Sequence, residues 1–161
     1  MSKLHILHGL PGTGKSTFAQ KLRDRGRTIV LNNDEWMIQL FGTNPPINDF
    51  PGNREKIERI QWEMAVSLIK EGMDVVWDYG VWTKAERAEL ISRAIKGGID
   101  FLFYRMVCPW ELALKRVLDR TQDSEGKCLV INKAAMEYFL TIFEPVEETE
   151  GFNVIDVDDI Q

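Results

Sequence analysis

A glycine-rich stretch near the start of the chain has the residue types needed to hold phosphate groups. Residues 9–17 read GLPGTGKST and fit the pattern G-x-x-x-x-G-K-[ST]. Glycines let the backbone curve until its N–H groups converge on phosphate oxygens, and larger side chains would obstruct that curve. Lys15 would reach the β and γ phosphates of a nucleotide, while the Ser16 hydroxyl would ligate Mg²⁺. We therefore predict a phosphate loop whose nucleotide contacts come from Gly9, Leu10, Pro11, Gly12, Thr13, Gly14, Lys15, Ser16 and Thr17.

Asp34 follows the apolar run at residues 28–32 (TIVLN), which we expect to be a buried strand. Ligands of α/β sheets meet the carboxyl ends of the strands, so this carboxylate is placed to orient an acceptor hydroxyl or to take its proton. The same segment could instead cap the helix predicted at residues 35–41, because asparagine and aspartate are both good N-caps. The two roles are compatible. We predict that one of the preceding asparagines caps the helix and that Asp34 is catalytic, with Glu35 in reserve.

Asp78 comes directly after the third apolar run, residues 73–77 (MDVVW), which we expect to be a strand. A carboxylate at the end of a buried strand beside a phosphate loop can support Mg²⁺, usually through a water molecule. A cap or turn residue before the next helix is the alternative. Because the phosphate loop is already present, we assign Asp78 to the metal site together with Ser16.

Arg116 and Arg120 are four residues apart on a predicted helix and therefore share one face. Arginines supplied from the same chain can stabilise the charge that develops on a phosphoryl group in transfer. An exposed stripe paired with acidic neighbours is the alternative, and for Arg116 both interpretations stay open. The catalytic role is favoured for Arg120, since the polar stretch 121–127 follows it and could belong to a lid at about residues 116–131.

Apolar runs and amphipathic helices must position these side chains, and they alternate along the chain. Alternation of this kind predicts a three-layer α/β/α fold, that of P-loop NTPases, around a largely parallel five-stranded sheet. A loop is expected at residues 42–52, which are rich in proline, glycine and asparagine. The expected strands are residues 3–8, 28–32, 73–77, 99–107 and 152–157. The expected core positions are Ile57, Ile60, Met64, Ala65, Leu68 and Ile69 in a helix at 54–70, and Ala88, Ile91, Ala94 and Ile95 in a helix that opens with the capping box Thr83–Glu86.

Length and composition suit one compact domain over residues 1–161, since 44% of the 161 residues are hydrophobic. The net charge of −5 weighs against broad affinity for nucleic acid. No segment resembles a signal peptide or a membrane span, so we expect a cytoplasmic protein with no membrane partner. Cys108 and Cys128 lack metal-ligand spacing, and we expect no disulfide between them.

Several motifs together resemble the small phosphate-loop kinases grouped with polynucleotide kinase, zeta toxin and chloramphenicol phosphotransferase. These motifs are GLPGTGKST, LNNDEW, VVWDYGVWTKAER, ELALKRVLDR and FEPVEETEGF, and the resemblance covers essentially the whole chain. It implies a nucleoside-monophosphate-kinase-like fold in which Asp34 activates a hydroxyl and the lid helix carries Arg116 and Arg120. Polynucleotide kinases have D-D-x-R where this chain has Asp34-Glu35-Trp36-Met37. Loss of that arginine favours a small hydroxylated acceptor over a nucleic acid.

The leading hypothesis is an ATP-dependent kinase that transfers the γ-phosphate to a hydroxyl of a small molecule, either a metabolite or an antibiotic. One alternative is a kinase for the 5′-hydroxyl of RNA or DNA. Another is a GTPase switch or a nucleotide sensor without catalysis. The run Asn132-Lys133-Ala134-Ala135 begins like the guanine-reading pattern N-K-x-D but lacks its aspartate, which argues against GTP.

Overall fold

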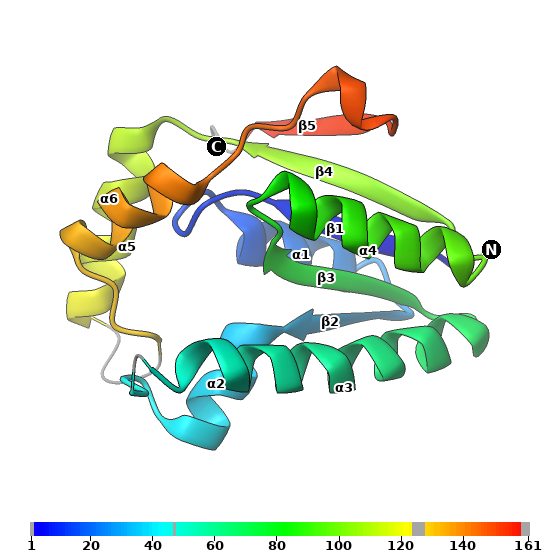
Figure 1. The fold of residues 1–161 in the computed structure, drawn as a ribbon, viewed down its shortest axis with the longest axis horizontal. Helices are drawn as coiled ribbons and strands as arrows, with labels where there is room; N and C mark the ends of the chain where they lie inside the picture. The colour runs from blue at the N-terminus through cyan, green and yellow to red at the C-terminus, as the bar shows by residue number, and fades with distance from the viewer. Residues whose placement is uncertain (1, 47, 124–127, 159–161) are drawn as a thin grey trace.

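The computed structural model describes residues 2–46, 48–123 and 128–158. Its described strands form one sheet in the order β2-β3-β1-β4-β5, and every neighbouring pair is parallel (Figure 1). The expected five-stranded parallel sheet is therefore confirmed. The strands are β1 Leu4–His8, β2 Thr28–Asn32, β3 Asp74–Gly80, β4 Phe101–Val107 and β5 Val154–Asp158.

Helices cover both faces of this sheet, which gives the expected three layers. α3 and α4 lie on one face and α1 lies on the other, while α5 and α6 stand beyond the carboxyl ends of the strands (Figure 1). The helices are α1 Lys15–Arg23, α2 Asn33–Phe41, α3 Phe50–Lys70, α4 Lys84–Lys96, α5 Trp110–Asp123 and α6 Lys133–Ile142, with a short 3₁₀ helix at Glu148–Glu150.

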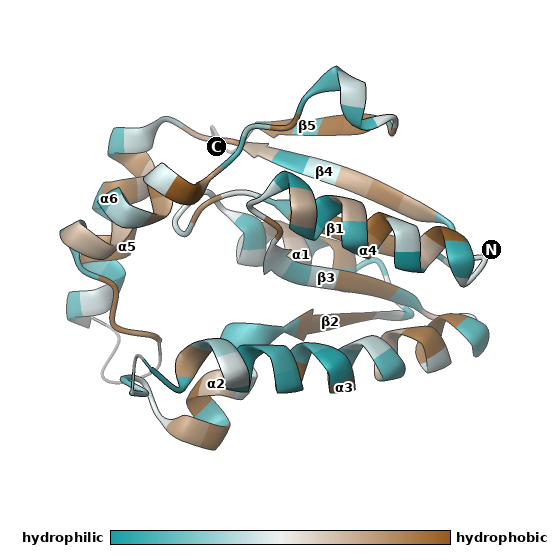
Figure 2. Cartoon of the chain, viewed as in Figure 1, coloured by the Kyte–Doolittle hydropathy of each residue, from teal (hydrophilic) through white to brown (hydrophobic). Residues whose placement is uncertain are grey.

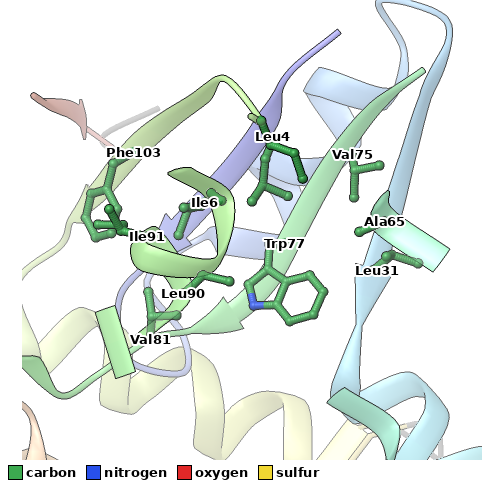
Figure 3. Packing of buried hydrophobic residues seen from close by; sticks show 12 residues of the cluster. Leu4, Ile6, Leu31, Ala65, Val75, Trp77, Val81, Leu90, Ile91 and Phe103 are labelled. Carbon is green, nitrogen blue, oxygen red and sulfur yellow. The ribbon is translucent and has the colours of Figure 1, made fainter. Parts of the chain in front are cut away.

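The central strands are apolar on both sides because each face packs against helices. Leu4 and Ile6 of β1 face α3 and α4, where they join a cluster that includes Trp77 and Leu90 (Figure 3). Leu7, which follows Ile6 in β1, belongs instead to the cluster beneath α1. Figure 2 shows the same arrangement, with hydrophobic central strands and a largely hydrophilic outer side of α3.

Side-chain caps begin three of the helices, two of them as the sequence indicates. Asn32 Oδ1 accepts a hydrogen bond from the backbone N–H of Glu35 at 2.9 Å, which confirms an asparagine cap for α2. Thr83 and Glu86 form the expected capping box at the start of α4. Asn132 caps α6 in the same manner as Asn32 caps α2. These local signals fix where the chain leaves the sheet edge and turns into helix.

Helix α3 differs from the expectation at its start and in its packed face. It begins at Phe50, so the end of the expected loop is helical, and proline is tolerated there because the first-turn N–H groups have no helical partner. Ile60 and Met64, expected in the core, are 45% and 38% exposed. Gln61 is fully buried instead, because its amide donates to the Asn32 carbonyl and its oxygen accepts from the Tyr79 hydroxyl. Fewer of the apolar side chains of α3 pack against the core than the sequence pattern suggests.

Helix α4 packs through only part of the expected face. Ile91 and Ala94 are buried as expected, but Ala88 and Ile95 are exposed, and Arg87 is buried. Arg87 makes a bidentate ion pair with Glu150, with both N–O distances at 2.7 Å, and it donates to the Glu144 carbonyl at 2.9 Å. A paired and hydrogen-bonded guanidinium can occupy a buried position, and here it fastens the segment before β5 to the start of α4.

A membrane-spanning helix and a disulfide between the two cysteines were both expected to be absent. No helix in residues 2–46, 48–123 and 128–158 has both the length and the apolar character of a membrane span. Cys108 and Cys128 both fall in this part of the chain and form no disulfide with each other.

Candidate active site

The phosphate loop connects the carboxyl end of β1 to the start of α1. Gly12 and Gly14 have positive φ angles of 80° and 92°, a conformation that suits glycine. A Cβ on Gly12 would lie 2.2 Å from the Ala113 carbonyl oxygen, so a side chain there would collide with α5. The loop needs glycine both for its curvature and for the close approach of this helix.

Lys15 lies over the loop that precedes it. Its Nζ donates to the Leu10 carbonyl at 2.9 Å, and the Thr13 hydroxyl donates to the same oxygen at 2.7 Å. Burial lowers the pKa of Lys15, while the negative charges of Asp78 and Asp34 act to raise it. The ammonium group is thus near both carboxylates that the sequence singled out, although Asp34 lies in α2 and Asp78 in β3.

Asp78 lies within β3 and not after it, because the strand continues to Gly80. Parallel pairing places Asn32 of β2 beside it. Its Oδ2 accepts hydrogen bonds from the Ser16 hydroxyl at 3.0 Å and from the Asn32 side-chain amide at 2.7 Å. The structure therefore brings Ser16 and Asp78 together, as expected, and adds an asparagine that orients the carboxylate.

The oxygens of Ser16 and Asp78 fit the ligand preferences of Mg²⁺. This ion prefers hard oxygen donors and usually takes one or two from the protein, with the remainder from substrate phosphates and water. The described residues contain no cluster of three or more acidic, histidine or cysteine side chains that would indicate an all-protein metal site. A hydroxyl and a carboxylate beside a phosphate loop can hold a nucleotide-bound Mg²⁺.

Asp34 stands in the first turn of α2 and keeps access to solvent. Even so, burial by the surrounding protein raises its pKa, and the positive charges of Lys15, Arg120 and Arg54 act in the opposite direction. Its carboxylate lies near enough to Lys15 for each charge to act on the pKa of the other group, at the carboxyl ends of β1 and β2.

The two arginines of α5 have different surroundings. Arg116 donates to the Gly12 carbonyl at 3.5 Å, so it packs against the phosphate loop. Arg120 is exposed, and its charge lowers the pKa of both Lys15 and Asp34. The predicted lid at 116–131 includes residues 124–127, which lie outside the described residues, and the helix before them extends to Asp123.

Other residues near the site carried no recognisable sequence signal. Trp82 donates its indole N–H to the Gly9 carbonyl at 3.0 Å, and its ring centroid lies 4.9 Å from that of Phe139 in α6. Arg54 of α3 is also near the site, since its charge acts to lower the pKa of Asp34. These contacts join segments that are far apart in the sequence, so no local motif could indicate them.

Comparison with protein families gives one match that spans most of the chain. The model of the family AAA_33, described as an AAA domain, matches residues 4–146. No curated protein matches the sequence significantly.

Solved structures share the fold over nearly the whole chain. A proposed kinase from Chloroflexus aurantiacus j-10-fl aligns with a TM-score of 0.76 at 19% identity, covering 98% of this chain and 88% of its own. The APS kinase CysC of Mycobacterium tuberculosis, solved with AMPPNP and APS, aligns at 0.58 and 17% identity, covering 99% and 90%. A chain of the Pnkp1/Rnl/Hen1 RNA repair complex aligns at 0.70 and 28% identity. That alignment covers 87% of this chain but only 43% of the RNA repair chain.

Proposed function

Because the chain belongs to the AAA_33 family of AAA domains and has a kinase-like P-loop fold, we propose that it transfers the γ-phosphate of ATP to a hydroxyl of a small molecule. The observation that carries this proposal is the placement of Lys15 and Asp34. Lys15 begins α1 after β1 and Asp34 lies in α2 after β2, so both stand at the carboxyl edge of the sheet, where each charge acts on the pKa of the other. The ammonium of Lys15 suits a phosphate, and the carboxylate of Asp34 suits an attacking hydroxyl.

The phosphate loop and the start of α1 bind the triphosphate. The loop N–H groups and the positive end of the helix dipole favour phosphate oxygens, and Lys15 neutralises charge on the β and γ phosphates. In this proposal Lys15 leaves the Leu10 carbonyl when nucleotide binds, since a phosphate is the stronger acceptor. Arg120, with Arg116 beside the loop, stabilises the transferred group.

Mg²⁺ would be held by Ser16 directly and by Asp78 through water, and when bound it neutralises charge on the β and γ phosphates. The protein's own part is to keep both ligands in place. Asn32 does so by donating to Asp78, which fixes the carboxylate beside the Ser16 hydroxyl.

Asp34 orients the acceptor hydroxyl and takes its proton as the oxygen attacks the γ phosphorus. The new P–O bond forms as the bond to the β-phosphate oxygen breaks, and ADP leaves with that oxygen. Burial raises the pKa of Asp34, which makes it a better proton acceptor than an exposed carboxylate, while the positive charges of Lys15, Arg120 and Arg54 act to lower that pKa. Glu35, the reserve candidate, is also exposed in the same turn of α2.

A direct assay of phosphoryl transfer tests the proposal. Purified protein, ATP and Mg²⁺ are mixed with a panel of hydroxyl compounds, and phosphorylated products are detected by mass. Lys15→Ala should lower transfer roughly 100- to 1000-fold, the loss expected when one preorganised donor to a developing charge is removed. Lys21→Ala, which changes an exposed lysine of α1, is the matched control and should keep full activity. Full transfer by Lys15→Ala would contradict the proposal.

A kinase for the 5′-hydroxyl of a polynucleotide is a second candidate. The 28% identity to a chain of an RNA repair complex favours it, whereas the net charge of −5 does not. Phosphate transfer to a 5′-hydroxyl oligonucleotide, with none to mononucleosides or small alcohols in the same assay, would select this candidate over the first.

A further inference from the structure

We propose that the guanidinium of Arg54 is the subsite for an anionic group of the acceptor, so that the acceptor is a hydroxy acid or a phosphorylated alcohol. The inference rests on the proposed function, because it assigns part of the site that Asp34 faces. It follows from three observations on Arg54: its attachment next to Asp34, its orientation by Glu86, and its position relative to the phosphate loop.

The backbone of Arg54 is fastened to the residue next to Asp34. The side-chain amide of Asn33, which is 4% exposed, donates to the Arg54 carbonyl at 3.3 Å. This contact joins the start of α2 to the first turns of α3. The contact places Arg54 close to Asp34, and its charge acts to lower the pKa of that carboxylate against the larger effect of burial.

A carboxylate on a third element holds the side chain in place. Arg54 Nη2 donates to Glu86 Oε1 at 3.1 Å, and the other oxygen of Glu86 accepts from the Thr83 backbone N–H at 3.0 Å in the capping box of α4. Among the described residues, Glu86 is the side chain to which this guanidinium donates. The Arg54 side chain is 35% exposed, and a guanidinium has five N–H donors. Glu86 orients the guanidinium, and Glu58 is near enough for the charge of Arg54 to act on its pKa. N–H donors of Arg54 remain for a further anion.

The sheet order places Arg54 on the acceptor side of the site. β2 and β3 lie to one side of β1, which leads into the phosphate loop, and β4, which leads into α5, lies to the other. The cations assigned to the triphosphate come from α1 and α5, whereas Arg54 comes from α3, between β2 and β3. In phosphoryl transfer the attacking and leaving oxygens lie roughly in line on opposite sides of phosphorus. A cation next to Asp34 on the β2 side therefore faces the attacking molecule.

Arg93 provides a matched comparison on the same pair of helices. It also joins α4 to α3, with Nη1 at 3.4 Å from Glu58 Oε1, but its guanidinium lies 4.3 Å from the centroid of the Trp62 ring. If the Arg54–Glu86 pair only stabilised the contact between the helices, replacing Arg54 and replacing Arg93 would have similar effects. A substrate-binding role predicts that they differ in the KM for the acceptor.

The test uses acceptor pairs that differ in the anionic group: glycerate with glycerol, gluconate with sorbitol, and ribose 5-phosphate with ribose. Phosphorylated product is measured for wild type, Arg54→Gln, Arg54→Lys and Arg93→Gln at saturating ATP and Mg²⁺. We expect the charged member of at least one pair to be preferred. Arg54→Gln should raise its KM roughly ten- to hundredfold with little change in kcat, as expected for loss of a hydrogen-bonded charge. Arg54→Lys should recover part of this loss, and Arg93→Gln should leave KM within about twofold.

Three outcomes would overturn the inference: preference for the neutral members, no transfer to any charged member, or an unchanged KM in Arg54→Gln. Transfer to neutral members alone would refute the anion subsite and leave the kinase assignment standing. Binding of inorganic phosphate to protein loaded with AMPPNP and Mg²⁺ gives a readout that does not need catalysis. Calorimetry should detect it in wild type and Arg93→Gln but not in Arg54→Gln, and equal binding by all three proteins would also count against the subsite.

Discussion

Trp82 donates its indole N–H to the carbonyl oxygen of Gly9 at 3.0 Å, which ties the segment after β3 to the first residue of the phosphate loop. Gly80 makes room for this contact, since a Cβ at that position would lie 2.6 Å from the indole nitrogen. The ring also packs against Phe139 of α6. The tryptophan thus links the loop to a helix at the edge of the site.

Replacing this tryptophan should weaken nucleotide binding without unfolding the protein. Trp82→Phe keeps an aromatic ring against Phe139 and removes only the hydrogen bond to Gly9. We expect the dissociation constant for ADP to rise roughly two- to tenfold, the value of one ordinary hydrogen bond, when measured by calorimetry. Trp36→Phe, on α2, should leave it unchanged, and equal affinity in both variants would contradict a positioning role for Trp82.

Asp34→Asn should abolish the fall of kcat/KM at low pH, the acid limb of its pH profile. A base works only when deprotonated, so wild-type kcat/KM should fall as the pH drops through the pKa of Asp34, which burial raises above its ordinary value of 3.8. The asparagine variant should be roughly 10²- to 10⁴-fold slower and lack this limb, while its affinity for ATP stays close to that of wild type. Glu35→Gln is the control from the same turn. If Glu35→Gln lost the limb and Asp34→Asn kept it, the two roles would be exchanged.

Removal of the buried arginine of α4 should destabilise the fold. Arg87→Met leaves the carboxylate of Glu150, only 5% exposed, without its partner, and a broken buried pair costs about 3–5 kcal/mol in unfolding free energy. Urea titration measures this loss, and Arg87→Met combined with Glu150→Gln should recover part of it. The exposed pair Lys84–Glu147 is the control, since Lys84→Met should leave the unfolding midpoint unchanged. A similar midpoint for Arg87→Met and wild type would show that the buried pair is not needed.

His8 should make the protein less stable in mild acid. Its Nδ1 donates to the Val81 carbonyl at 3.0 Å, Nε2 has no hydrogen-bond partner within the described part of the chain, and burial lowers its pKa from 6.5 to about 4. Between these values the unfolded chain binds the proton and the folded chain does not, so stability falls as the pH falls. The loss should reach about 3 kcal/mol between pH 6.5 and 4.

A His8→Phe variant tests this dependence. The new ring can keep the stacking with Phe143, whose centroid lies 4.8 Å from that of His8. Urea unfolding at several values between pH 6.5 and 4 should show a shallower slope for the variant, and comparison with wild type cancels the contributions of other groups. Parallel slopes would mean that His8 titrates normally in the folded state.

The sequence by itself determined the phosphate loop, the order of the elements and most helix starts. These features depend on residues close together in the chain: the spacing from Gly9 to Ser16, the glycine conformations, and caps such as Asn32 and Thr83 that bind an N–H three residues on. It also assigned Asp78 and Ser16 to one metal site, and in the structure the two side chains are hydrogen-bonded at 3.0 Å.

Only the tertiary structure decided which side chains meet across the strands and which helix faces are packed. Periodicity shows that α3 has an apolar side, but the contact with the sheet sets its width, so Gln61 is buried while Ile60 and Met64 are exposed. Likewise, Trp82 reaches Gly9, Arg87 reaches Glu150 and Arg54 reaches Glu86 across 32 to 73 residues of sequence. Such contacts depend on the relative position of whole elements, which packing of the core fixes and which no local spacing of residues encodes.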